Sequence, residues 1–147
     1  MLVKDIMTTA VHTALPTADA EDILQIMKRE NTDMVAICDI QKHLVGIITE
    51  RDIITRFEPG KKAGAIMTPE PEYTAPRDDV HDAALKMSNK KVRRLPVVEN
   101  DKLIGILTLR DFAKKRIFRL QRFIINTGQR MCRRFLTNGE SDYIFIL

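Results

Sequence analysis

Two stretches of the chain, residues 44–52 (LVGIITERD) and 103–111 (LIGILTLRD), have nearly the same sequence. Each begins with an apolar run around one glycine, which is typical of a buried strand. Each ends in Thr-x-x-Asp, which is typical of the first turn of a helix. The chain is therefore predicted to build the same strand-to-helix turn twice, and the rest of the fold is expected to follow this repetition.

The repetition extends from the N-terminus to Asp111. The first match is Ile6-Met7-Thr8, which recurs as Ile66-Met67-Thr68. Four more residues recur at the same sequence separation: Pro16, Asp19, Asp22 and Met27 are matched by Pro76, Asp79, Asp82 and Met87. The two strand-to-helix stretches are separated by one residue fewer than the earlier matches, which indicates that the second unit has lost one residue between Met87 and Leu103. We place this deletion in the turn near Asn100. We predict two tandem units, residues 1–57 and 66–118, with a linker at 58–65 that contains the breaker Pro59-Gly60.

Each unit predicts a short lead strand followed by helix, strand, strand and helix. Apolar spacing favours helices over residues 19–30 and 79–89, and short apolar runs favour strands over residues 34–38, 44–48, 95–98 and 103–107. Second helices are expected to start at Thr49 and Thr108. One unit is too small to cover both faces of a three-stranded sheet. We therefore predict an α+β fold in which two β-α-β-β-α units pack sheet to sheet with pseudo-twofold symmetry, forming two equivalent clefts.

The composition of the chain sets the class of protein. With 44% hydrophobic and 30% charged residues the chain can form a compact core, and with 5% aromatic residues that core is aliphatic. No apolar run reaches the length of a membrane span, and the N-terminus does not resemble a secretory signal. Two cysteines do not make a disulfide framework. We therefore expect a cytoplasmic protein with no membrane partner.

Positive charge gathers at the C-terminal end of the chain. Residues 112–147 hold eight Lys and Arg against two acidic residues, whereas residues 1–111 carry a net charge of −2. We predict that the last helix continues through Arg122, that Gly128 interrupts it, and that residues 129–136 form basic helical turns. Asn138-Gly139 predicts a turn, and residues 143–147 predict a strand.

Two interpretations of this basic extension, residues 119–147, stay open. It packs on the module or on a second subunit through its apolar residues, or its basic face contacts RNA or DNA through residues 112–136. Aromatic and basic residues are mixed without a known nucleic-acid motif, which favours packing.

The repeated Thr-x-x-Asp also has two interpretations. Thr and Asp at this spacing form a capping box, in which each side chain hydrogen-bonds to the backbone of the other. Alternatively, the Asp accepts hydrogen bonds from a vicinal diol such as a ribose, and Thr, Arg51 and Arg110 lie near a phosphate. The spacing alone does not decide between them.

The order of Ile-Met-Thr, helix, strand, and a strand that ends in Gly-x-x-Thr-x-x-Asp, present twice, resembles a tandem pair of CBS domains (a Bateman module) over residues 1–118. The resemblance implies a regulatory protein that binds an adenosine-containing ligand such as AMP, ADP, ATP or S-adenosylmethionine between the repeats. It implies no obligatory cofactor and association into a homodimer.

The resemblance also assigns residues to each cleft. In the first cleft Asp111 would hold the ribose, with Thr108, Arg93, Arg94, Arg110, Thr9, Val11 and Thr32 around the ligand. In the second cleft Asp52 would do so, with Thr49, Arg51, Asp33, Val92 and Pro69. An acidic residue is unfavourable beside a phosphate, and Asp33 stands where the other repeat has Arg93. We therefore expect the Asp111 cleft to be the main site, and Asp111→Ala to weaken binding more than Asp52→Ala. The Asp52 cleft is then either empty or accepts a ligand with less negative charge.

No catalytic constellation stands out in the sequence. His12, His43 and His81 are isolated, no spacing of Cys and His resembles a zinc site, and no phosphate-binding loop is present. We expect no enzyme activity and no metal. The alternative to a ligand-binding module is a homodimeric interaction protein that binds RNA, DNA or a partner protein through its basic extension.

Overall fold

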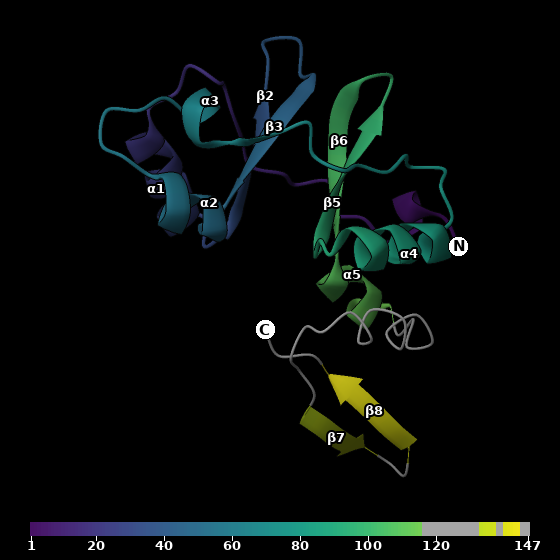
Figure 1. The fold of residues 1–147 in the computed structure, drawn as a ribbon. Helices are drawn as coiled ribbons and strands as arrows, with labels where there is room; N and C mark the ends of the chain where they lie inside the picture. The colour runs from purple at the N-terminus through teal and green to yellow at the C-terminus, as the bar shows by residue number, and fades with distance from the viewer. Residues whose placement is uncertain (116–132, 138–139, 145–147) are drawn as a thin grey trace.

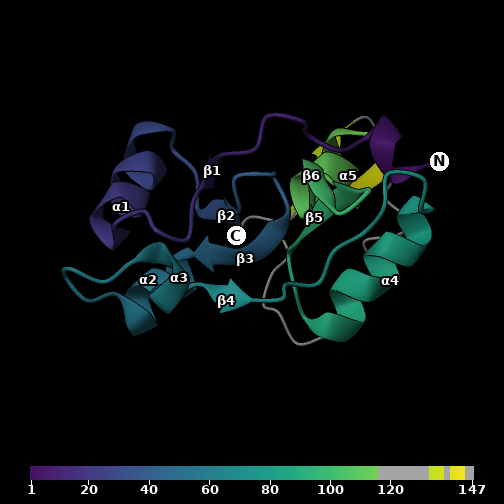
Figure 2. The same ribbon diagram turned by 90° about the horizontal axis from the view of Figure 1, so that it is seen from above.

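Two β-sheets lie in the middle of the molecule, and helices cover their outer sides (Figure 1). The structure is a computed structural model that describes residues 1–115, 133–137 and 140–144. Seen from above, α1, α2 and α3 flank one sheet and α4 flanks the other (Figure 2). This arrangement confirms the predicted α+β fold of two similar halves.

The first half contains a four-stranded sheet in the order β1-β2-β3-β4. Strand β1 runs parallel to β2, and the other neighbours are antiparallel. Its elements are β1 (Thr13–Ala14), α1 (Ala20–Arg29), β2 (Met34–Cys38), β3 (Leu44–Thr49), α2 (Glu50–Arg56), α3 (Ala63–Ile66) and β4 (Thr68–Pro69). Every residue of β2 is buried, because this strand lies inside the sheet and both of its faces are covered.

The second half repeats this order with shorter pairings. Its elements are η1 (Val3–Asp5), α4 (Val80–Lys90), β5 (Arg94–Glu99), β6 (Lys102–Thr108) and α5 (Leu109–Lys114). Strands β5 and β6 are antiparallel, a parallel bridge joins Thr74 to Val97, and an antiparallel bridge joins Thr8 to Ile106. These bridges occupy the places that β1 and β4 occupy in the first half.

The predicted helices and strands agree with α1, α4, β2, β3, β5 and β6. The register also locates the deletion between the repeats. Cys38 pairs with Leu44 in the first half, and Val98 pairs with Leu103 in the second, so the spacing changes within the connecting turn, as predicted. Asn100 there has a φ of 51°, a left-handed conformation that Asn tolerates well.

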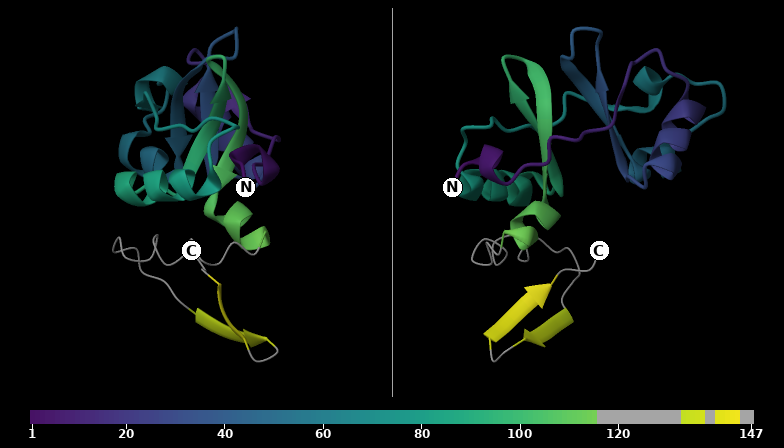
Figure 3. Two further views of the ribbon diagram at one scale, coloured as in Figure 1. Left: turned by 90° about the vertical axis from the view of Figure 1, so that its right-hand side faces the viewer. Right: turned by 180° about the vertical axis from the view of Figure 1, so that it is seen from behind.

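The lead segments are exchanged between the two halves. The resemblance implied a crossing for Thr9 and Val11, which it assigned to the Asp111 cleft, but not that the lead segments enter the opposite core. Val3 and Ile6 are buried in the core formed by α4, β5 and β6, whereas Ala63 and Ile66 are buried against α1, β2 and β3. Figure 3 shows the N-terminal segment passing from one half to the other. Strand β4 therefore pairs with β3 of the first repeat, and Thr8 pairs with Ile106 of β6 in the second, so each lead segment lies at the edge of the opposite sheet.

Two further expectations need correction or lie outside the described residues. Residues 63–66, expected mostly within a linker, form helix α3, which stands at the same place in its repeat as η1. Residues 133–136, expected to be helical, belong to strand β7 (Arg133–Thr137), which pairs with β8 (Glu140–Ile144). Helix α5 ends at Lys114, and the expected helix to Arg122 and the break at Gly128 fall outside the described residues.

Candidate functional site

Asp52 and Asp111 each close a capping box at the start of a short helix. The Asp52 Oδ2 atom accepts hydrogen bonds from the Thr49 backbone N–H (2.9 Å) and hydroxyl (3.1 Å). Asp111 Oδ2 accepts the same two bonds from Thr108, both at 2.8 Å. The carboxylates satisfy otherwise unpaired donors at the start of α2 and α5, which explains the recurring Thr-x-x-Asp locally.

The second oxygen of each carboxylate is bound by the lead segment of the opposite repeat. Thr68 donates its hydroxyl to Asp52 Oδ1 (2.9 Å), and Thr8 donates to Asp111 Oδ1 (3.1 Å). The sequence alone assigned no role to Thr8 or Thr68, although the recurrence of Ile-Met-Thr marked both. They tie each Asp to the lead segment that crosses from the other half.

Two glycines let those lead segments approach. A Cβ atom on Gly46 would lie 2.9 Å from the Thr68 carbonyl oxygen, and one on Gly105 would lie 3.0 Å from that of Thr8. Both distances are shorter than a Cβ atom tolerates without a shift of the neighbouring backbone. The glycine of each repeated stretch therefore brings Thr68 and Thr8 within reach of the carboxylates.

A cavity of about 750 Å³ opens beside Asp52, and we call it the Asp52 cavity. It gathers five of the six residues expected in the second cleft, namely Asp33, Thr49, Arg51, Asp52 and Val92. Pro69 is not in the lining, which contains the neighbouring Glu70 and Pro71 instead. Arg93 and Arg94, which we expected to serve the Asp111 cleft, also line the Asp52 cavity. The remaining lining residues are Ile47, Glu50, Thr55, Arg56, Thr68, Glu72 and Lys91.

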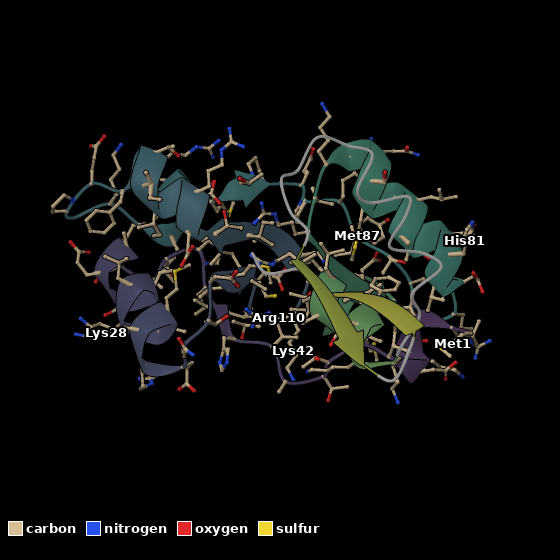
Figure 4. The ribbon with its side chains drawn as sticks, turned by 90° about the horizontal axis from the view of Figure 1, so that it is seen from below. Met1, Lys28, Lys42, His81, Met87 and Arg110 are labelled. Atoms are coloured by element: carbon tan, nitrogen blue, oxygen red, sulfur yellow. The ribbon has the colours of Figure 1, made fainter. Side chains whose placement is uncertain are left out.

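The residues expected around Asp111 are divided between two other spaces. Thr9 and Val11 line a cavity of about 370 Å³ that Cys38 and Leu103 also line. A groove of about 860 Å³ is lined by Thr32, Arg93, Arg94, Thr108 and Arg110. Asp111 itself is 3% exposed and lines none of these three spaces. In the view from below, Arg110 lies near the middle of the molecule and Lys28 lies on α1 (Figure 4).

Ion pairs already occupy part of the Asp52 cavity. Arg94 of the second half pairs with Asp33 of the first. Arg56 lies 3.8 Å from the Asp52 carboxylate, and Lys90 lies 3.1 Å from Glu72. The cationic groups at this site are thus balanced by acidic neighbours. Among the described residues, no three His, Cys, Asp or Glu side chains gather so as to hold a metal ion.

The duplicated fold is that of a tandem CBS-domain protein. The model of the CBS domain family matches residues 3–58 and again 63–117, so the chain belongs to that family. The CBS domain-containing protein YhcV of Bacillus subtilis is 33% identical over 116 residues, which cover 76% of this chain and 82% of YhcV. The chain spans only 32% of the length of another relative, an uncharacterized 33.4 kDa protein of Thermofilum pendens.

Solved structures of similar fold include ligand complexes. The crystal structure of CBSX2 in complex with AMP has a TM-score of 0.71 and 30% identity, covering 79% of this chain and 96% of that one. The CBS domain pair of protein MJ0100, in complex with 5′-methylthioadenosine and S-adenosyl-L-methionine, has a TM-score of 0.71 and 28% identity, covering 79% and 95%. Within the part of this chain that the structure describes, every helix is too short or too polar to span a lipid bilayer.

Proposed function

We propose that this chain is a regulatory module that binds an adenosyl ligand in the Asp52 cavity, between the two CBS repeats. The observation that carries the proposal is the single space in which Asp52, Thr49, Thr68 and the guanidinium groups of repeat two lie together. CBS pairs of similar fold have been solved in complex with AMP, and with 5′-methylthioadenosine and S-adenosylmethionine. We therefore propose the Asp52 cavity as the main site, in place of the Asp111 cleft that the sequence favoured.

The carboxylate of Asp52 has room for one more hydrogen bond without rearrangement. An oxygen of this kind accepts two hydrogen bonds, and Oδ2 already receives both from Thr49. Oδ1 receives one, from Thr68. A ribose diol therefore binds Oδ1 through one hydroxyl and reaches a second acceptor position only by displacing the Thr68 hydroxyl.

Ligand binding regulates such a module when one arrangement of its halves binds the ligand better than another. The Asp52 cavity is lined by residues of both repeats, including Thr49 and Asp52 from one and Val92 and Arg93 from the other. A ligand that contacts both walls therefore favours one relative position of the repeats. We propose this regulatory role in place of catalysis.

Isothermal titration calorimetry with AMP, 5′-methylthioadenosine and S-adenosylmethionine tests the proposal. At least one of them should bind, and Asp52→Ala should weaken binding by about tenfold or more, because a hydrogen bond to a charged group contributes about 1.5–3 kcal/mol. Asp111→Ala is the matched control, since it removes an equivalent capping box. It should change the affinity by less than about threefold, because no hydrogen bond to the ligand is lost. Absence of binding, or a larger loss with Asp111→Ala, would contradict the assignment.

Homodimer formation is the second part of the proposal. Ile54 of α2 is 83% exposed and lines the groove beside Leu24 of α1, so an apolar surface is open on these helices. Light scattering after size exclusion should give twice the mass of the chain. Ile54→Glu should shift that mass toward the monomer, and a monomeric wild type would contradict this part alone.

A further inference from the structure

One ion pair joins the two halves at the wall of the Asp52 cavity. Arg94, at the start of β5, is 17% exposed and donates to the carboxylate of Asp33, just before β2. Both residues line the Asp52 cavity and also the neighbouring groove, so the pair stands between the two spaces. Any ligand in the cavity that approaches Arg94 also meets Asp33.

The ion pair between Arg94 and Asp33 has no counterpart at the site that the pseudo-twofold axis relates to it. In the alignment of the two repeats, Asp33 corresponds to Arg93 and Met34 corresponds to Arg94. The guanidinium group of Arg94 in the second repeat therefore pairs with Asp33 of the first, and the equivalent pair is missing at the symmetry-related position, where Met34 replaces the arginine. This asymmetry places an anion and a cation side by side in the wall of one cavity.

The described residues that line the Asp52 cavity are balanced in charge. Among the residues that the structure describes, five acidic and five basic side chains line it, so these residues supply no excess of positive charge to compensate a phosphate dianion. A phosphate that binds Arg94 must also displace or repel the Asp33 carboxylate, which costs binding free energy. A ligand group with both signs of charge meets a partner on each member of the pair.

We infer that Asp33 is a specificity-determining residue of the Asp52 cavity. It favours an adenosyl ligand whose 5′ substituent carries an ammonium and a carboxylate over one that ends in a phosphate. In this arrangement Asp33 accepts hydrogen bonds from the ammonium, and Arg94 donates to the carboxylate. The inference rests on the proposed function, because it requires the adenosine part to bind at Asp52.

Calorimetric titration of the full chain with three probes tests the inference. S-adenosylmethionine carries the ammonium and carboxylate, AMP carries the phosphate, and 5′-methylthioadenosine has an uncharged 5′ end. The wild type should bind S-adenosylmethionine more tightly than AMP. Asp33→Asn should raise the AMP affinity by about tenfold and lower that of S-adenosylmethionine by about threefold or more, while 5′-methylthioadenosine changes by less than about twofold.

Asp101→Asn is the matched control, because it removes the same charge from an exposed turn outside the cavity where φ is 63° and Asn is tolerated. It should leave all three affinities unchanged. Equal shifts for AMP and S-adenosylmethionine with Asp33→Asn, or no shift, would overturn the inference. If 5′-methylthioadenosine binding still depends on Asp52 in that case, the proposed function stands. If none of the probes binds either protein, both proposals fail.

Discussion

Asp52 and Asp111 accept the same hydrogen bonds from equivalent threonines, yet their surroundings differ. Asp52 lines a cavity of about 750 Å³ together with Arg93 and Arg94 of the other repeat. Asp111 lines none of the three spaces at the site, although the two carboxylates are similarly buried, Asp52 at 6% and Asp111 at 3% exposed. The Thr-x-x-Asp sequence therefore builds a helix cap in both repeats. Whether that cap also faces a ligand depends on what the opposite repeat places in front of it.

The largest expected effect comes from the glycines beside the two carboxylates. Gly46→Ala should lower the free energy of unfolding by about 2–3 kcal/mol, because overpacking against backbone has a cost of this size. The added methyl group would press on Met67 and on the Thr68 carbonyl oxygen. Chemical denaturation followed by circular dichroism measures the change.

Gly105→Ala is the paired variant for this test, and its contacts with Met7 and the Thr8 carbonyl oxygen are slightly longer. It should destabilise the chain by a similar or smaller amount, yet leave ligand affinity less affected than Gly46→Ala does. Full stability in both variants would show that the lead segments do not pass this close to the glycines.

Thr68 and Thr8, which hydrogen-bond to Asp52 and Asp111 from the lead segments, provide a second comparison of the two carboxylates. Thr68→Val removes the hydroxyl that competes with a ribose for Asp52 Oδ1. The free energy of unfolding should fall by about 1–2 kcal/mol, whereas the affinity for an adenosyl ligand should rise by up to about fivefold. Thermal denaturation and calorimetric titration measure these two quantities.

Thr8→Val is the corresponding change at Asp111, where the same type of hydrogen bond is lost. It should reduce stability by a comparable amount with no change in affinity. A fall in affinity with Thr68→Val would mean that the Thr68 hydroxyl assists the ligand instead of competing with it.

A smaller difference between the halves concerns pH. Hydrogen bonds from the Ala75 N–H and then the Thr74 hydroxyl hold the pKa of Asp78 below its ordinary value of 3.8. The first half has Ala14 and Ala18 at the positions of Thr74 and Asp78 and lacks this contact. The ionised Asp78 therefore stabilises the second half above pH 3.8, and this contribution is lost as the pH falls through the lowered folded-state pKa.

Asp78→Ala makes the second half resemble the first at this position. It should reduce the free energy of unfolding by about 1 kcal/mol at neutral pH, and the difference from wild type should narrow as the solution is acidified below the ordinary pKa. Urea denaturation at several pH values measures it. A difference that grows on acidification would contradict the assigned role of the carboxylate.

Much of the fold was predictable because the strong signals are local. The apolar spacing of α1 and α4, the two strand pairs and the capping boxes at Thr49 and Thr108 depend on residues close together in the chain. Helix α3 was missed because Ala63–Ile66 is one turn long and follows a Pro-Gly breaker. So short a segment has too few positions to show a helical period.

The grouping of the site residues was less predictable. The sequence indicated Arg93, Arg94 and Asp33 as residues near a ligand and assigned the arginines to the Asp111 cleft, whereas in the structure they line both the groove beside Thr108 and the Asp52 cavity. Their position with Asp52 depends on how two halves pack, and pseudo-twofold symmetry leaves two equivalent assignments. The hydroxyls of Thr8 and Thr68 were missed for the same reason, since each acts on an Asp in a distant part of the chain.

The duplication, the order of helices and strands, and the capping chemistry could all be read from the amino-acid sequence, because each of these arises between near neighbours. Which lead segment pairs with which sheet, and that Asp52 lines a cavity shared by the two repeats, became clear only from the folded molecule. Those outcomes follow from contacts between segments far apart in the chain, where equivalent residues compete for equivalent places and packing selects one arrangement.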